Sequence, residues 1–176
     1  QFARDDLAET IHAVLLETGL SPKRLEVEVT ESTVMSDRTR GLQILRKLKA
    51  MGISVAMDDF GTGYSSLATL HAFPFDKIKL DQSFVRRLPQ DAAAAAIVRT
   101  VLALGASLNI PVLAEGIETE AQWQFLAREG CAKGQGYLFA KPQNVAQLPA
   151  AIAAAGRFVR EEEPMPFDAP RPAMAR

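Results

Sequence analysis

The sequence has few of the residues that build disulfide or histidine-based frameworks. Cys131 is the only cysteine among 176 residues, which excludes an internal disulfide and favours a reducing compartment. His12 and His71 are the only histidines and fall on expected helices, so a histidine-rich zinc site is disfavoured. No apolar run approaches the roughly 18 residues of a membrane span, and no signal peptide is visible at the start.

An excess of charge of one sign is also lacking. The chain carries 20 basic and 21 acidic side chains, a formal net charge of −1, so broad electrostatic binding to DNA, RNA or membrane surfaces is not expected. Hydrophobic residues make up 48% of the chain, and the mean hydropathy is +0.01. This composition and length are typical of one globular domain with a substantial core.

Apolar residues recur with strand and helix spacing in alternation along the chain. Strands are expected at residues 25–30, 53–57, 77–80, 111–114 and 134–139. Helices are expected to end at Gly19, Gly52 and Gly130. Asp91 is expected to cap one helix, and Thr119 with Gln122 to form the capping box of another. A short helix is expected at about 65–71, and a last one is expected to begin near Asn144. Alternating strands and helices with short connections predict parallel βα units.

Acidic or polar clusters end all five expected strands. They are EVTE at 28–31, DDFG at 58–61, KLD at 79–81, AEG at 114–116 and GQGY at 134–137. Because side chains alternate along a strand, each strand has an apolar face for helices and another face that ends in charge. In a closed barrel these tips converge above the interior. An open doubly wound sheet is the alternative, with its site near a switch point.

Four carboxylates at these tips are candidates for binding divalent cations. Without cations Glu28, Asp58, Asp59 and Glu115 would repel one another, whereas Mg²⁺ or Mn²⁺ takes such oxygen ligands. A pair of cations roughly 3.5–4 Å apart can stabilise both oxygens of a phosphoryl displacement. Lys79 beside them could orient a water molecule, or accept its proton if its pKa is depressed.

Each of these residues also has an ordinary structural interpretation. A strand-end carboxylate can be a helix cap or part of a surface salt bridge, Asp58 and Asp59 can serve a turn, and Lys79 can be a solvated charge. The glycine-containing segment 59–67 can be a loop that closes over a site, or a tight strand-to-helix turn. The repetition of charged tips on one side of the predicted sheet favours the metal site.

The chain resembles the EAL domain, the cyclic-di-GMP-specific phosphodiesterase of bacterial second-messenger signalling. The matching stretches are QF at 1–2, EVTES at 28–32, DDFGTGYSSL at 58–67, KIKLDQSFV at 77–85, AEGIET at 114–119 and GQGYLFAKP at 134–142. They span essentially residues 1–155. The resemblance implies a TIM-type (β/α)₈ barrel with an antiparallel first strand, of which this chain holds about the last five βα units.

The resemblance also implies an activity and a role for each matched residue. The activity is hydrolysis of cyclic di-GMP to linear pGpG at a two-metal site of Mg²⁺ or Mn²⁺. The implied metal ligands are Glu28, Asp58, Asp59 and Glu115. Lys79 would orient or activate the water, Asp81 would support its strand tip, and Gln135 would face the metal-bound water or the substrate. The supporting acids would be Glu31 and Glu118, and the loop would contain Phe60, Gly61, Thr62 and Gly63. It further implies a homodimer through that loop and a fused GGDEF or sensory domain upstream.

Two metal ligands of the family have no counterpart in this sequence. The Glu-Ala-Leu motif is absent, and the family's Asn would lie just before Gln1. We therefore interpret residues 1–156 as a partial EAL domain and 157–176 as a flexible proline-rich tail, and we expect little activity and poor solubility from the isolated chain. A cytoplasmic location is expected, with upstream segments able to anchor the protein to a membrane. A degenerate EAL domain that senses cyclic di-GMP or binds a partner, and an unrelated phosphate-binding barrel, are the alternatives.

Overall fold

The computed structural model describes residues 2, 4, 6–61, 70 and 72–158. The chain divides into two compact units, Gln1–Leu138 and Phe139–Arg176. The helix expected near 65–71, the loop residues Thr62 and Gly63, and the tail from residue 159 lie outside the described residues. No helix in the described part of the chain is both long and apolar enough to cross a membrane.

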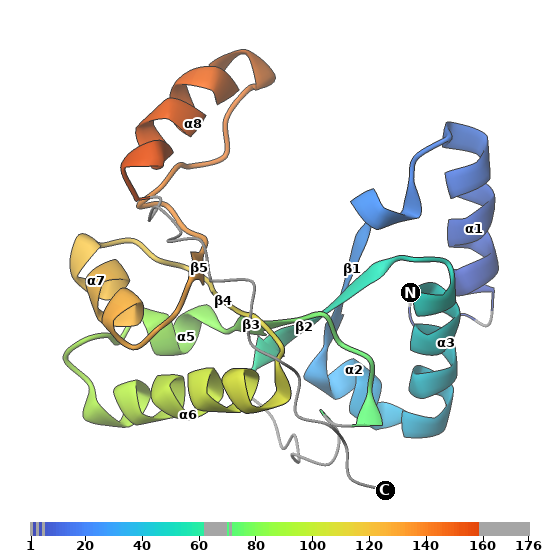
Figure 1. Ribbon diagram of the computed structural model, residues 1–176, viewed down its shortest axis with the longest axis horizontal. Coiled ribbons are helices and arrows are strands. Elements are labelled where there is room, and N and C mark those ends of the chain that lie inside the picture. The colour runs from blue at the N-terminus through green and yellow to red at the C-terminus, as the bar shows by residue number, and fades with distance from the viewer. Residues whose placement is uncertain (1, 3, 5, 62–69, 71, 159–176) are drawn as a thin grey trace, which may run out of the picture. The chain divides into compact units, whose positions relative to one another are not determined.

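The first unit is built on a five-stranded sheet in which all neighbouring strands are parallel (Figure 1). The strands are β1 (Glu26–Thr30), β2 (Ser54–Phe60), β3 (Lys77–Leu80), β4 (Val112–Ala114) and β5 (Lys133–Gly134). Their spatial order follows their order in the chain. The predicted parallel α/β architecture is thus confirmed. A doubly wound sheet reverses its strand order at a switch point, and the described strands show no such reversal.

Helices precede and connect these strands. In the first unit they are α1 (Leu7–Thr18), η1 (Pro22–Arg24), α2 (Glu31–Ser36), α3 (Arg38–Ala50), α5 (Gln82–Val85), α6 (Ala92–Leu108) and α7 (Glu120–Arg128). Helix α3 packs on β2, and α6 packs on β3 and β4. The long helices therefore cover the sheet with the amphipathic faces that their sequence periodicity predicts.

The core lies on the sheet face that these helices cover. Val55 and Met57 of β2 and Ile78 and Leu80 of β3 are fully buried, and each such side chain contributes about 1.5–3 kcal/mol of transfer free energy. Residues between them in the sequence point to the opposite face, which carries the charged side chains. The register pairs Met57 with Ile78, so apolar residues of neighbouring strands lie side by side.

The predicted helix caps are present. The Asp91 side chain accepts hydrogen bonds from the backbone N–H groups of Ala93 and Ala94, at 2.8 and 3.0 Å, at the start of α6. Thr119 and Gln122 form the reciprocal capping box of α7. These contacts satisfy amide groups that have no partner within the helix.

The prediction of a fifth strand over residues 134–139 is wrong, since β5 is confined to Lys133–Gly134. The Ile117 N–H donates to the Gln135 carbonyl, and the Leu138 N–H donates to the Ile117 carbonyl, so the segment turns around Ile117. Gly136 passes so close to the Ile117 backbone that any Cβ would overlap it. The glycine permits this close approach, which the apolar pattern alone does not indicate.

The second unit contains η2 (Val145–Gln147), α8 (Leu148–Ala155) and η3 (Gly156–Phe158). Within it, Phe139 and Phe158 pack edge to face with their ring centroids 5.1 Å apart. Asn144 occupies the N-cap position of η2, where the last helical segment was expected to start. The proposed boundary between residues 156 and 157 stays a prediction.

Replacing Asp91 with alanine should destabilise the protein by about 1 kcal/mol, because two amide groups of α6 lose their acceptor. For a chain of this size we expect a fall in Tm of roughly 2–4 °C, measured by thermal unfolding. Asp91→Asn is the matched control, since it retains an acceptor oxygen and removes only the charge. An equal loss in both variants would show that the ion pair with Arg87, and not the cap, stabilises this helix end.

Candidate functional site

The ammonium group of Lys79 gathers three carboxylates at the carboxyl ends of the strands. Its Nζ lies 2.8 Å from Glu28 Oε2, 3.0 Å from Asp58 Oδ1 and 2.9 Å from Glu115 Oε1. Glu28 comes from β1, Asp58 from β2, and Glu115 follows directly after β4. The structure therefore brings together four side chains that the strand-end pattern singled out, three carboxylates and the lysine that they surround.

Lys79 is buried, with 6% of its side chain exposed, whereas its partners are more accessible. Burial works against the charged ammonium, but close contacts with Glu115, Glu28 and Asp58 outweigh it and raise the pKa of Lys79 well above its usual value. Lys79 is thus a permanent cation in this arrangement. It can donate hydrogen bonds and neutralise charge, while proton acceptance, which needs a depressed pKa, is disfavoured.

Glu115 experiences the opposite balance. Burial raises the pKa of its carboxyl group, with the Lys79 ammonium opposing this shift and the charges of Asp58 and Glu28 adding to it. Three carboxylates around one ammonium leave an excess of negative charge, so the cluster still favours a further cation.

Adjacent Asp58 and Asp59 occupy an irregular end of β2. The register with β3 shifts between Met57 and Phe60, and Asp59 has a φ of 54°, in the left-handed region. This bulge returns Phe60 to the core, where it pairs with Leu80, while both aspartates stay near the site. Burial raises the pKa of Asp59, and the neighbouring Asp58 and Asp81 carboxylates raise it further. The two aspartates thus form a dense acidic pair.

Asp81 is also the N-cap residue of a short helix, a role that the sequence analysis did not assign to it. Its side chain accepts a hydrogen bond from the Ser83 N–H at 3.0 Å and caps the short helix α5. Its negative charge also raises the pKa of the nearby Asp59 carboxyl group. The expected role of Asp81 in supporting the strand tip that carries Lys79 stays a prediction.

The remaining predicted site residues lie around this centre in different environments. Glu31 is 3% exposed at the start of α2, and neither carboxylate oxygen has a hydrogen-bond partner among the described residues. Gln135 is exposed, and its backbone pairs with Ala114 and Ile117. Glu118 is also exposed, with its Oε1 3.8 Å from Arg86 Nε. Their roles toward a ligand remain predictions.

The loop expected near the site begins in the described part of the chain and then leaves it. Phe60 is buried, and Gly61 has a φ of 98° and lies against the ring of Phe84. A Cβ at Gly61 would be 3.0 Å from that ring, so glycine suits both the backbone angle and the space. Thr62 and Gly63 lie outside the described residues.

The donor set suits a hard divalent cation. Asp58 Oδ1 is buried, and its close contact among the described residues is the Lys79 ammonium at 3.0 Å. It is flanked by carboxylates and lacks histidine or thiolate neighbours within the cluster, which favours Mg²⁺ or Mn²⁺ over zinc. No group of three or more His, Cys, Asp and Glu within the described ranges has the spacing of a metal site; the carboxylates converge on the ammonium instead.

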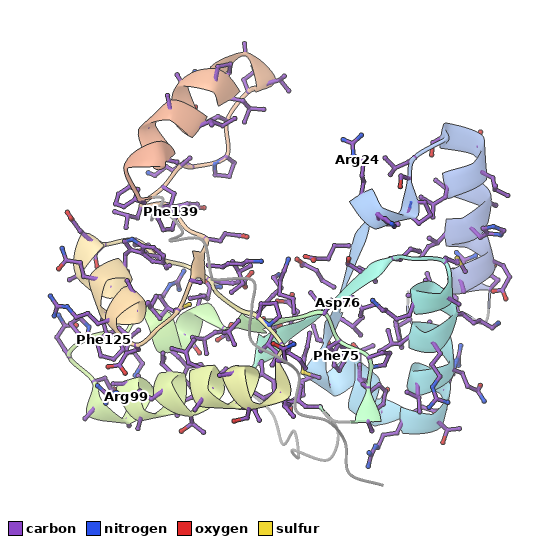
Figure 2. All side chains as sticks on the ribbon, in the orientation of Figure 1. Arg24, Phe75, Asp76, Arg99, Phe125 and Phe139 are labelled. Atoms are coloured by element: carbon purple, nitrogen blue, oxygen red, sulfur yellow. The ribbon has the colours of Figure 1, made fainter. Side chains whose placement is uncertain are left out.

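A hollow of about 590 Å³ lies elsewhere, at the opposite strand ends between α6 and the segment that leads into β5. Arg99 crosses its rim, pairing with Glu129 at 2.8 Å and lying over the Phe125 ring (Figure 2). Its lining is mainly aliphatic and has no cluster of acids. The charged strand tips, and not this hollow, are therefore the candidate site.

Sequence reasoning missed one charged pair on the same face of the sheet. Lys77 Nζ donates to both oxygens of Glu26, at 2.7 and 2.6 Å. The signal was present in the alternation of EVE at 26–28 and KIK at 77–79, which places each acid and each lysine two residues apart on one face.

Comparison with known proteins relates this geometry to a described family. The family model for the EAL domain matches residues 1–142. The bifunctional diguanylate cyclase/cyclic di-GMP phosphodiesterase MucR of Pseudomonas aeruginosa is 46% identical over 153 residues, which are 87% of this chain and 22% of MucR. The chain spans less than a quarter of the length of the first curated relatives that it matches.

Solved structures agree with this relationship. A structure of the PaMucR phosphodiesterase in complex with c-di-GMP superposes with a TM-score of 0.80 at 46% identity, covering 84% of this chain and 60% of that one. Klebsiella pneumoniae BlrP1 in a manganese/cyclic-di-GMP complex gives a TM-score of 0.74 at 37% identity, covering 80% of this chain and 36% of that one. These structures are EAL domains with the TIM-barrel fold.

Lys79→Met should destabilise the protein at pH 7, because three carboxylates lose their shared cation. The loss should fall below the roughly 3–5 kcal/mol of a fully buried pair, since the carboxylates are partly exposed. It should shrink as the pH falls into the acidic range, because burial raises the pKa of the Glu115 carboxyl group and this partner becomes neutral first. Chemical denaturation across this range measures the effect, with Lys47→Met, which breaks the exposed pair with Glu9, as the control. A deficit independent of pH would instead indicate lost packing of the lysine stem.

Proposed function

Since this chain belongs to the EAL domain family, we propose that it supplies the catalytic strand ends of a metal-dependent phosphodiesterase that hydrolyses cyclic di-GMP to linear pGpG. The observation that carries the proposal is the convergence of Glu28, Asp58 and Glu115 on Lys79 at the carboxyl ends of parallel strands. Chemistry in TIM-type barrels is located at these strand ends. The ligands present in related structures, cyclic di-GMP with manganese or calcium, support the substrate and the class of metal.

We assign the binding of Mg²⁺ or Mn²⁺ to the oxygens of Glu28, Asp58, Asp59 and Glu115. When bound, two such cations polarise the phosphoryl group and make a bound water more nucleophilic. Hydrolysis would form a bond between a water oxygen and phosphorus and break one ring P–O bond, and the departing oxygen would take up the proton that the water loses. The acidic pair Asp58–Asp59 would offer adjacent carboxylate oxygens to such cations.

The protein residues around this centre have distinct roles in the proposal. Lys79 donates from its ammonium group, orienting the water and reducing the repulsion between its three carboxylate partners. Asp81 holds the tip of β3 through its cap on α5. We assign to Gln135, which is exposed, a contact with water or substrate. Glu31 and Glu118 are assigned supporting positions, with Glu31 next to the loop that contains Phe60 and Gly61.

The wider assembly follows from the same family membership. A homodimer through the region of the loop at 59–67, a fused GGDEF or sensory domain and a cytoplasmic location are part of this proposal. The alternative is a degenerate EAL domain that binds cyclic di-GMP and does not cleave it. The retained acids and lysine favour the enzyme, because a pure sensor has no need for a lysine held among metal-binding carboxylates.

The proposal is tested by incubating the intact protein that carries this chain with cyclic di-GMP and Mg²⁺ or Mn²⁺ and following pGpG by chromatography. Lys79→Ala should lower kcat by about 10²–10³-fold, the usual cost of removing one preorganised hydrogen-bond donor from an active site. Glu9→Gln, at an exposed pair away from the strand tips, should retain parental activity. Cyclic di-GMP binding without turnover would favour the sensor, and near-parental turnover in Lys79→Ala would remove Lys79 from the chemistry.

A further inference from the structure

The site has a second ion pair beneath it on the same face of the sheet. Glu26 and Lys77 form a two-pronged pair at 2.7 and 2.6 Å, while Glu28 and Lys79 pair at 2.8 Å. Glu26 and Glu28 are two residues apart on β1, and Lys77 and Lys79 are two residues apart on β3. The two pairs are therefore successive rungs of one ladder, separated by roughly 6.5–7 Å along the strands.

Both rungs cross β2, which contributes neither partner to the lower rung and adds Asp58 as a further partner of Lys79 in the upper one. β2 lies between β1 and β3, and the two outer strands are about 9–10 Å apart. On this face the register places Ser54 beside Glu26, and Ala56 between Glu28 and Lys77. Because these residues of β2 are small, the long acidic and basic side chains can meet above them. A larger residue at Ala56 would block the crossing.

The spacing creates competition between the rungs. Glu28 is 48% exposed and forms an ion pair with Lys79. Ala56 pairs with Glu28 on one side and with Lys77 on the other. The Cα atoms of Lys77 and Glu28 therefore lie at the same level along the strands. A lysine has a flexible stem and can redirect its ammonium to a different carboxylate. Glu26 prevents this by holding Lys77 with both of its oxygens.

We propose that Glu26 is a positioning residue, which keeps Lys77 away from Glu28 so that Glu28 stays available at the strand tips. This inference rests on the proposed function in so far as Glu28 is assigned as a cation ligand. Its structural part, the choice of partner by Lys77, does not depend on any activity. Neither Glu26 nor Lys77 contacts the reacting atoms in this scheme, and their effect is exerted through Glu28.

An ordinary salt bridge makes a different prediction from a positioning pair. A partly exposed pair contributes about 0–1 kcal/mol to stability, and removing either partner has similar effects. In the positioning scheme the two partners are unequal. Loss of Glu26 frees a cation to occupy Glu28, whereas loss of Lys77 frees only an acid, which does not compete for a carboxylate.

The test measures Mn²⁺ affinity by titration calorimetry in the intact protein that carries this chain. Glu26→Gln should weaken the Mn²⁺ Kd by about 3–10-fold, equivalent to roughly 0.7–1.4 kcal/mol. Lys77→Met should bind Mn²⁺ no more weakly than the parent. The double variant should return to within about twofold of the parental Kd, because no free lysine remains to compete. Glu9→Gln is the matched control, since it removes an acid from an exposed pair on α1 and α3.

A second measurement separates this inference from the proposed function. The ammonium signals of Lys77 and Lys79, followed by NMR without metal, should both shift in Glu26→Gln, and the Lys79 signal should return in the double variant. If the parent does not bind Mn²⁺ but these signals change as stated, the metal site fails and the positioning role stands. An unchanged Lys79 signal in Glu26→Gln, or a double variant as impaired as Glu26→Gln, would overturn the role of Glu26.

Discussion

The burial of one ammonium group among three carboxylates is the constraint on which the rest of the site depends. An unpaired charge at the position of Lys79, 6% exposed, would cost several kcal/mol, so its partners must approach from different directions. They do so because parallel strands end at a common edge, where β1, β2 and the residue after β4 each provide an acid. A shift of one residue in the register of β3 would turn Lys79 into the apolar core and remove all three contacts.

The same constraint explains the irregular end of β2. A regular strand would direct Asp58 toward the charged face and Asp59 toward the helices, where a carboxylate has no place in the core. The bulge at Asp59, with its φ of 54°, removes this conflict by keeping both acids near the strand tip and returning Phe60 to the apolar side. Aspartate tolerates the left-handed region better than most residues, so the local backbone and the density of charge favour the same residue type.

The sequence predicted much of this arrangement because its signals are local. The strand at 77–80, the cap at Asp91 and the Thr119–Gln122 capping box depend on residues within one turn or one strand, and they are present in the structure. The wrong extent of the fifth strand has a different origin, since Gly136 turns against Ile117, far away in the sequence. The ladder of Glu26 and Lys77 was missed for a similar reason: its partners lie 51 residues apart and meet across an intervening strand.

The arrangement also decides between the two roles that the sequence left open for Lys79. A lysine accepts a proton only when its charged form is disfavoured, as in an apolar pocket or beside another cation. Here the three carboxylates raise its pKa. A raised pKa contributes stability that is complete below the unfolded value of about 10.4 and is lost only as the pH rises through the folded value. At neutral pH the charged form is therefore both the abundant and the stabilising one. Lys79 could become a base only if its three carboxylate partners turned away from it. In the proposed scheme Glu26 also keeps Lys77 away from one of these partners, Glu28. The geometry thus favours Lys79 as a hydrogen-bond donor that holds the carboxylates and a water molecule in place. The proposed chemistry then depends on where these carboxylates lie.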